Sequence, residues 1–240
     1  RHTFGYSLGY LHTNFDVKDG NKSEEKADTL QLGFHNKYSL NDWILSNDVT
    51  GMLSFHNVDR VMDWTHLEKS KMSGSYETYS IMSNNKLGKE YTLTKNLSLK
   101  PYAGLKAGYT TRGSFTESGL EGLEVKGNDY FTLKPKAGIE LNGEVPLGKE
   151  DKWKLKGSLD VEYGYELGNV TKREYARLEN IETDYHKLSK PEKDKGELRT
   201  GAQVGVEIED RYGIFLTGEY TAGNNKNSDY RAGISLKAVF

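Results

Sequence analysis

Strict alternation of apolar and polar side chains limits the folds open to this chain more than any other feature of its sequence. In WKLKGSLDVEYGYEL, residues 153–167, the odd positions hold mainly apolar or aromatic residues and the even positions mainly charged or small ones. Successive side chains of a β-strand point to opposite faces, so this segment has one apolar face and one charged face as a strand. In a helix, the two kinds of residue would mix on every side. The segment is predicted to be a β-strand.

The same period of two recurs along the chain. The weakest match is at 74–92, where Ser83 and Asn85 interrupt the apolar face, and Asn47 interrupts it in the same way within 43–57. Alternating runs bounded by turn residues indicate strands. Strands are predicted near 3–12, 28–38, 43–57, 74–92, 97–110, 133–142, 153–167, 198–209, 212–222 and 230–240.

The length of these runs favours a membrane barrel over a soluble β-sandwich, which is the alternative. Strands of soluble proteins have about five or six residues, whereas a tilted membrane strand needs roughly nine to eleven. The mean hydropathy of −0.76 is typical of a soluble or disordered protein, and the lack of a run of about 18 apolar residues excludes a transmembrane helix. A barrel escapes both tests, because a barrel strand shows only alternate residues to lipid. The predicted fold class is all-β, a transmembrane antiparallel up-and-down β-barrel in which ten strands are readable.

The connections between the predicted strands are of two kinds, in strict alternation. Outer-membrane barrels have long extracellular loops and short periplasmic turns, so the first strand is expected to run outward and Phe240 to end in the periplasm. The long connection at 168–197, with its charge run Lys187–Arg199, is expected to be solvated, and an adhesive or plugging role stays open. Long connections lie at 13–27, 58–73, 111–128 and 168–197, with a shorter one at 223–228; tight ones lie at 39–42, 93–96, 146–151 and 209–212.

Aromatic residues collect beside both kinds of connection. Amphipathic rings favour the headgroup level of a bilayer, so two girdles are predicted, with an aliphatic band between them. The high β-propensity of tyrosine explains the presence of these residues but not their clustering at strand ends. The predicted girdle residues are Tyr38, Trp43, Tyr109, Trp153, Tyr163, Tyr165, Tyr220 and Tyr230.

Composition excludes several other functions. The chain has no cysteine, so it has no disulfide or cysteine-ligated metal, and its net charge of −2 leaves no basic excess for nucleic acid. No metal or other cofactor is expected, because five of the six histidines lack metal-ligand spacing. These five are His2, His12, His35, His56 and His66.

Catalytic motifs are also lacking, so the chain is not expected to be an enzyme. No G-x-S-x-G elbow, H-E-x-x-H or Walker motif occurs. Asp184 and His186, with Asp16 or Asp19 from another connection, could mimic the Asp–His pair of the omptin proteases. Two residues at this spacing are expected by chance, and a solvated loop explains them.

Several segments together resemble the C-terminal translocator barrel of monomeric type V autotransporters. They are LSLKPYAGLKAGY at 97–109, GSFTESGLEGLEV at 113–125, the strand containing Gly138, and Asp59-Arg60 after the strand at 43–57. The ending YRAGISLKAVF is similar to the assembly signal of outer-membrane proteins. Its signal residues are Arg231, Gly233, Leu236, Ala238 and Phe240.

The resemblance implies a barrel of twelve strands, of which residues 1–240 cover the last ten as a single domain. The first two strands and the linker helix before them have no counterpart in the chain. Either an N-terminal part is omitted, or the barrel is incomplete, with Arg1–His12 and Ser228–Phe240 as free edges. A barrel still held by its assembly machinery would fit the second possibility.

The implied function is to anchor an N-terminal passenger in the bacterial outer membrane and to help export it. The implied partners are outer-membrane lipid, the barrel assembly machinery, periplasmic chaperones, and the protein's own passenger and linker helix. The assembly machinery would capture the C-terminal strand by β-augmentation, with Phe240 docked in an apolar site or acting only as a girdle anchor. Some family barrels cut their passenger, for which Glu140, Asp160 and Glu162 are candidate acids. A free-standing porin or adhesin barrel is the alternative function.

The polar face of the strands would line the lumen of such a barrel. Its mixed charges favour a network around a threaded segment, although they could also merely solvate a water-filled interior. The predicted lumen-lining residues are Lys134, Lys136, Glu140, Lys154, Lys156, Asp160, Glu162, Glu166, Arg199, Glu207, Glu209, Glu219 and Lys237, together with Arg231.

Overall fold

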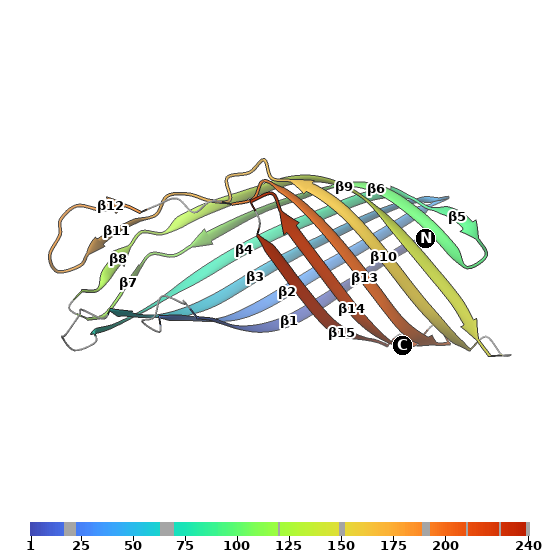
Figure 1. Ribbon diagram of the computed structural model, residues 1–240, viewed down its shortest axis with the longest axis horizontal. Coiled ribbons are helices and arrows are strands. Elements are labelled where there is room, and N and C mark those ends of the chain that lie inside the picture. The colour runs from blue at the N-terminus through green and yellow to red at the C-terminus, as the bar shows by residue number, and fades with distance from the viewer. Residues whose placement is uncertain are drawn as a thin grey trace.

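The protein forms one large curved antiparallel sheet, a half-barrel, in the computed structural model (Figure 1). The prediction of an all-β antiparallel fold is confirmed. Its ten long strands are β1 (His2–Asp16), β2 (Glu24–Leu40), β3 (Trp43–Met62), β4 (Ser70–Lys89), β6 (Leu97–Arg112), β9 (Asn128–Leu147), β10 (Trp153–Tyr165), β13 (Gly196–Ile208), β14 (Tyr212–Gly223) and β15 (Ser228–Ala238). The structure describes residues 1–16, 23–62, 70–119, 121–148, 152–188, 193–209, 211–225 and 227–238.

Each long strand pairs with the next one along the chain, as in an up-and-down barrel. The order is β1-β2-β3-β4-β6-β9-β10-β13-β14-β15, and the short strand β5 (Tyr91–Thr94) pairs with β6. β1 and β15 form the two ends of this order, and each is paired on one side only within the described residues. No helix in that part of the chain is long and apolar enough to cross a bilayer.

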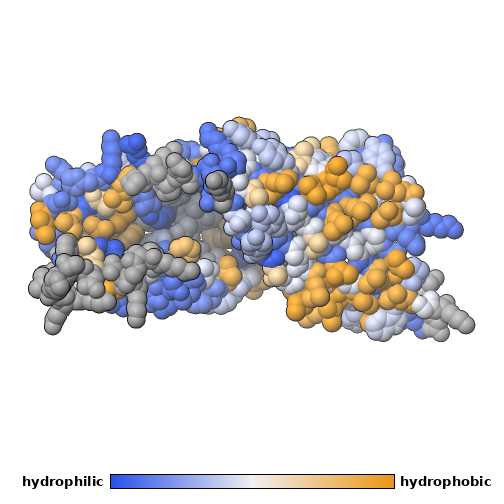
Figure 2. Space-filling view, in the orientation of Figure 1, coloured by the Kyte–Doolittle hydropathy of each residue, from blue (hydrophilic) through white to orange (hydrophobic). Residues whose placement is uncertain are grey.

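The apolar side chains of the strands lie on the outside of the sheet. Leu8 is 83% exposed, Leu159 57% and Ile234 73%. The buried hydrophobic residues of the described chain are few, namely Ile44, Met72, Tyr102, Val125 and Ala176. Figure 2 shows broad hydrophobic patches over the part of the molecule in which Figure 1 places β13, β14 and β15. A soluble sandwich would bury these apolar faces between its two sheets. Here the apolar faces are exposed instead, so the sheet is not one layer of a sandwich.

Residues with a positive φ, in the left-handed region of backbone conformation, lie in three of the tight connections. Asn41 has a φ of 53° in the β2–β3 turn and Gly148 has a φ of 88° after β9. Glycine adopts this conformation freely and asparagine tolerates it, so both residues suit short hairpin turns. Glu209 has a φ of 52° and lies in the β13–β14 turn, beyond the end of β13. We call this end of the sheet the tight-turn end, and the opposite one the long-connection end.

A second small sheet forms from two connections that were predicted to be loops. It has the order β12-β11-β8-β7, with β7 (Phe115–Thr116), β8 (Leu123–Val125), β11 (Tyr175–Leu178) and β12 (His186–Lys187). In Figure 1 it lies at the end of the molecule opposite β5. The predicted solvated loop at 168–197 therefore contains paired strands. These strands have two to four residues each, too few for a period of two to be visible in the sequence.

Candidate functional site: the charged inner wall

The concave face of the sheet, which we call the inner wall, carries most of the charged side chains of the strands. One contact shows how strongly the sheet is curved. Lys86 of β4 places its Nζ 3.2 Å from Glu162 Oε2 of β10, although β6 and β9 lie between these two strands. Side chains separated by two intervening strands meet only on the concave side of a strongly curved sheet. The outer face is the opposite one, where the apolar side chains lie.

Tyr102 of β6 lies at the centre of the inner wall. Its hydroxyl lies 2.7 Å from Asp160 Oδ2 and 2.9 Å from Glu162 Oε2, and the residue is only 6% exposed. The tyrosine reaches these carboxylates of β10 by crossing β9 at Gly138. A Cβ at position 138 would lie 2.5 Å from the Tyr102 hydroxyl, so only glycine leaves room for the ring. The hydroxyl has a single proton, which the two carboxylates share.

Basic side chains from three strands compensate the two carboxylates of β10. Lys136 Nζ lies 3.0 Å from Glu162 Oε2, and the Arg199 guanidinium contacts Asp160. The same guanidinium lies 2.7 Å from Glu219 Oε2 of β14. Together with Lys86, these contacts join strands from β4 to β14 in one network. A buried charge is costly unless paired, and here each carboxylate has a cationic partner.

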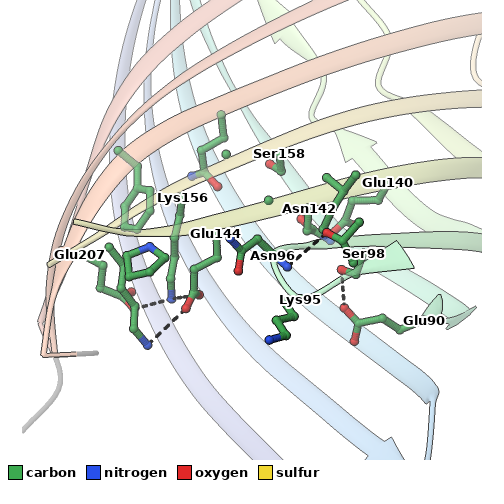
Figure 3. Close-up of a pocket in the computed structure, with 18 of the residues that line it drawn as sticks. Glu90, Lys95, Asn96, Ser98, Glu140, Asn142, Glu144, Lys156, Ser158 and Glu207 are labelled. Atoms are coloured by element: carbon green, nitrogen blue, oxygen red, sulfur yellow. Dashed lines mark hydrogen bonds and ion pairs between the residues drawn. The ribbon is translucent and has the colours of Figure 1, made fainter. Parts of the chain in front are cut away.

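A second network lies near the tight-turn end, beside a cavity of about 980 Å³. Glu207 is 2% exposed and contacts Lys156, and its Oε2 lies 2.5 Å from Lys237 Nζ of β15. Lys156 also lies 3.3 Å from Glu144, whose second oxygen is 3.2 Å from Lys154. Figure 3 shows Lys156 between Glu144 and Glu207, with their polar ends directed toward one another. This network ties the last strand to β10 and β13 across the wall.

The remaining predicted lumen residues have partners of different kinds. Lys134 pairs with Glu197 at 2.6 Å, and Glu140 pairs with Lys100 at 2.7 Å. Glu166 is 6% exposed and accepts backbone hydrogen bonds from Leu133 and Gly168, so it fastens the end of β10. Glu209 lies in a turn and not on the wall. Several partners on the wall were not singled out in the sequence, although they occupy polar-face positions of the alternating strands. They are Lys86, Lys100, Tyr102, Glu144 and Glu197.

The predicted girdle residues all project from the outer face or its ends. Trp43 and Trp153, beside tight turns, are each 50% exposed, and Lys89 lies 6.0 Å above the Trp43 ring. At the long-connection end, the rings of Tyr220 and Tyr230 lie 4.9 Å apart. The other girdle residues are also exposed: Tyr38, Tyr109, Tyr163 and Tyr165.

Comparison with known proteins assigns the family. Residues 1–219 match the family model described as "Autotransporter beta-domain". The chain belongs to the autotransporter β-domain family. Members of this family are outer-membrane barrels of type V secretion with structural and transport roles. This confirms the resemblance seen in the sequence. No curated protein matches the chain.

Two solved structures share the fold of this autotransporter β-domain. The translocator domain of the autotransporter NalP from Neisseria meningitidis has a TM-score of 0.71 and 16% identity, covering 100% of this chain and 74% of that one. The β domain of the Bordetella autotransporter BrkA has a TM-score of 0.64 and 13% identity, covering 100% of this chain and 84% of that one. At these identities the likeness establishes the architecture alone.

The predicted assembly signal of this β-domain lies in β15. Arg231, Gly233, Leu236 and Ala238 belong to the strand, whose only partner in the described chain is β14, and Phe240 lies outside the described residues. Leu236 is 78% exposed. The Arg231 guanidinium reaches Glu219 at 3.7 Å, at the margin of the inner network.

Asp59 and Arg60 of the β-domain make contacts at the long-connection end of the sheet. Arg60 Nη2 lies 2.6 Å from Glu117 Oε2 and donates to the Glu121 carbonyl at 2.9 Å. Glu117 is 3% exposed and also accepts the Leu123 N–H. Asp59 accepts a 2.6 Å hydrogen bond from the Ser73 hydroxyl. The Arg60–Glu117 contact therefore holds the connection at 111–128 against β3, and the Ser118 N–H, which donates to the Ser73 carbonyl at 2.8 Å, holds it against β4.

The second sheet carries its own half-buried ion pair, between Arg177 and Glu124. The hydroxyl of Tyr185 donates to Glu124, and Arg177 Nε donates to the other carboxylate oxygen at 2.7 Å. The hydroxyl of Tyr185, followed by the Arg177 guanidinium, lowers the pKa of the Glu124 carboxyl. The charged form of Glu124 thus links β8 to β11.

The remaining histidines and acidic residues singled out in the sequence lie in other contacts or outside the described residues. His186 Nε2 lies 3.3 Å from Glu182, and Asp19 and His66 lie outside the described residues. His56 Nδ1 lies 2.7 Å from Glu25 Oε1 and stacks on Tyr76. Within the described ranges, no three histidine or acidic residues are grouped to hold a metal ion.

Proposed function

We propose that this chain anchors an N-terminal passenger in the bacterial outer membrane and helps it to cross. The observation that supports the proposal is that the two faces of the sheet differ in polarity. The outer face exposes large apolar side chains, including Leu8 and Ile234, while the inner wall carries charges that are paired with one another. Closed into a barrel, a sheet with these two faces would satisfy its backbone in lipid and keep a polar interior.

The pairing of the inner charges suits the passage of a polypeptide. Glu162 and Glu207 are each held by two or more cationic groups, so both signs of charge lie side by side in the two networks of the wall. A wall with strong net charge would retain a segment of opposite charge. A balanced wall offers short-lived polar contacts to any hydrophilic chain, which is what transport requires.

The proposed partners follow from the same surfaces. The exposed girdle and the apolar band contact outer-membrane lipid, and the inner wall contacts the passenger and its linker helix. The barrel assembly machinery, supplied by periplasmic chaperones, receives the chain through β15, whose outer edge is unpaired within the described residues. Residues 1–240 act as one domain, and export itself requires no covalent chemistry from it.

A matched pair of glycine variants tests transport. Gly201 on the inner wall and Gly218 on the outer face lie on adjacent strands, and neither has a neighbour closer than 3.9 Å to a built Cβ. The full-length protein with an epitope on its passenger is displayed on cells and probed with external protease. We expect Gly201→Trp to reduce surface exposure of the epitope while the barrel still inserts. Gly218→Trp, which projects into lipid, leaves exposure unchanged.

The alternative of a free-standing porin or adhesin predicts a different result. In that case no N-terminal segment reaches the cell surface, and the two tryptophan variants display the epitope equally poorly. Equal exposure of the epitope in wild type and Gly201→Trp would also contradict transport through this lumen.

A further inference from the structure

Three side chains on the inner wall of β1, β2 and β3 form a chain of hydrogen bonds that the transport role does not use. Ser7 Oγ lies 2.9 Å from His35 Nε2, and His35 Nδ1 lies 2.7 Å from Asp48 Oδ1. Both distances fall within the range of hydrogen bonds between a nucleophile and its base. The order serine, imidazole, carboxylate is that of an activated serine nucleophile.

Strand register brings the three residues together. His35 is directly opposite Asp48 on β3 and Gly5 on β1, and Ser7 is directly opposite Gly33. Side chains at these positions point to the same face, since positions two apart on a strand, and positions opposite each other on paired strands, share a face. Three consecutive strands each contribute one member.

A glycine makes the serine–histidine contact possible. Gly33 is buried, and a Cβ at this position would overlap Ser7 Oγ and lie 3.1 Å from His35 Nε2. Any other residue at position 33 would therefore separate the hydroxyl from the imidazole. The serine–histidine contact therefore depends on Gly33, which has no functional group. Substituting Gly33 can break the contact while the three reactive side chains remain.

We propose that Ser7 is a nucleophile that hydrolyses carboxylic esters, with His35 as its general base and Asp48 orienting the imidazole. Ser7 Oγ attacks the carbonyl carbon while its proton passes to His35 Nε2. The C–O bond to the leaving alcohol then breaks, and the alcohol departs with that proton. Water, activated by the same imidazole, attacks the acyl group and releases the carboxylic acid and free Ser7. Asp48 holds the Nδ1–H bond throughout.

The surroundings of Ser7 indicate the class of ester. The side chains of His35 and Asp48 are 46% and 39% exposed, and a Cβ at the neighbouring Gly5 would have nothing within 4 Å. The site is thus an open stretch of wall and not a closed acyl pocket. Small or extended esters that diffuse into the lumen fit it, with little selectivity for the acyl group. This activity is independent of passenger export.

The test uses the full-length protein in isolated outer membranes, with a fluorophosphonate as the covalent probe and p-nitrophenyl acetate as the ester. We expect one adduct, located at Ser7 by peptide mass spectrometry. The adduct disappears in Ser7→Ala, and its rate of formation falls on the order of 100-fold in His35→Gln, the usual contribution of a general base. Gly33→Ala lowers the rate similarly with all three reactive groups retained.

Two controls separate this chemistry from general effects. Ser158→Ala removes another serine of the inner wall, and His56→Gln removes another histidine paired with a carboxylate. Both should be labelled at the wild-type rate. Equal labelling of Ser7 in wild type and folded His35→Gln, or adducts spread over many serines, would overturn the proposal. If Gly33→Ala fails to fold, His35→Gln still decides the outcome.

Discussion

Replacing Gly138 with alanine should break the centre of the inner wall. The added Cβ would lie 2.5 Å from the Tyr102 hydroxyl and 2.6 Å from the Val161 carbonyl oxygen. Contacts this short do not occur between real atoms of this kind, so the tyrosine ring must move off β9. It then loses its positions 2.7 Å from Asp160 and 2.9 Å from Glu162.

The cost has two parts. A hydrogen bond to a charged acceptor contributes about 1.5–3 kcal/mol, and Tyr102 is only 6% exposed, so water replaces it poorly. Overpacking beside the backbone of Val161 adds about 1–3 kcal/mol. The carboxylates keep their basic partners Lys136 and Arg199, which limits the loss. We expect Gly138→Ala to lower the free energy of unfolding by about 3–5 kcal/mol.

Urea unfolding in lipid vesicles, followed by tryptophan fluorescence, measures this loss. Tyr102→Phe removes only the hydroxyl and should cost about 1.5–3 kcal/mol. In Gly138→Ala combined with Tyr102→Ala the ring clash is absent, although the contact with Val161 remains. The double variant should therefore be more stable than the sum of its single variants predicts, by about 1 kcal/mol or more. Additive losses, or a loss below about 0.5 kcal/mol for Gly138→Ala, would refute the reasoning.

Three further predictions concern other contacts. Glu207→Gln should destabilise the sheet by about 2–3 kcal/mol, because Lys156 and Lys237 both lose this carboxylate, although Lys156 keeps Glu144, and the coupling to Lys237→Met in a double-mutant cycle checks this. Asn47→Leu alone should cost about 1 kcal/mol, since Asn85 Oδ1 on the outer face loses its hydrogen-bond donor. The double variant Asn47→Leu with Asn85→Leu should unfold at nearly the wild-type urea concentration. The folded-state pKa of Glu124 is below its unfolded value, so its contribution is complete above the unfolded pKa and is lost as pH falls through the folded pKa. The protection of β8 amides from hydrogen exchange should fall as the pH drops below the ordinary pKa of a glutamate, and unchanged protection would contradict this assignment.

The alternation in the sequence predicted the ten long strands because each has one face toward an apolar surrounding and one toward polar groups. It placed the strand ends less well. β9, for example, begins at Asn128 and reaches Leu147, beyond the run at 133–142. The Arg60–Glu117 contact and the short strands of the second sheet depend on tertiary pairing between separate connections. No local pattern encodes them.

The structure explains why polar residues interrupt the alternating pattern on some apolar faces. Asn47 and Asn85 interrupt apolar faces, and they face each other across β3 and β4, with Asn47 Nδ2 donating to Asn85 Oδ1 at 2.6 Å. Asn85 in turn donates to Ser83 Oγ at 3.0 Å. Polar groups on an outer face are satisfied by each other, a relation that appears only when the strand register is known.

The Ser7–His35–Asp48 contact could not be read from the sequence for a similar reason. The residues come from three strands, and neither spacing corresponds to a known motif. His35 was recognised only as a histidine without metal-ligand spacing. Register, and the small size of Gly33, bring the hydroxyl and the imidazole together.

The most direct test of the central claim is the reactivity of single cysteines along β10, because the natural chain contains no cysteine. Cysteines at Ser158 and Asp160 on the inner wall, and at Leu159 and Val161 on the outer face, are treated in a bilayer with a charged maleimide. We predict rapid reaction at the two inner positions, and reaction at the two outer positions only after unfolding in urea. Equal reactivity along the strand, or faster reaction at Leu159 and Val161, would contradict it.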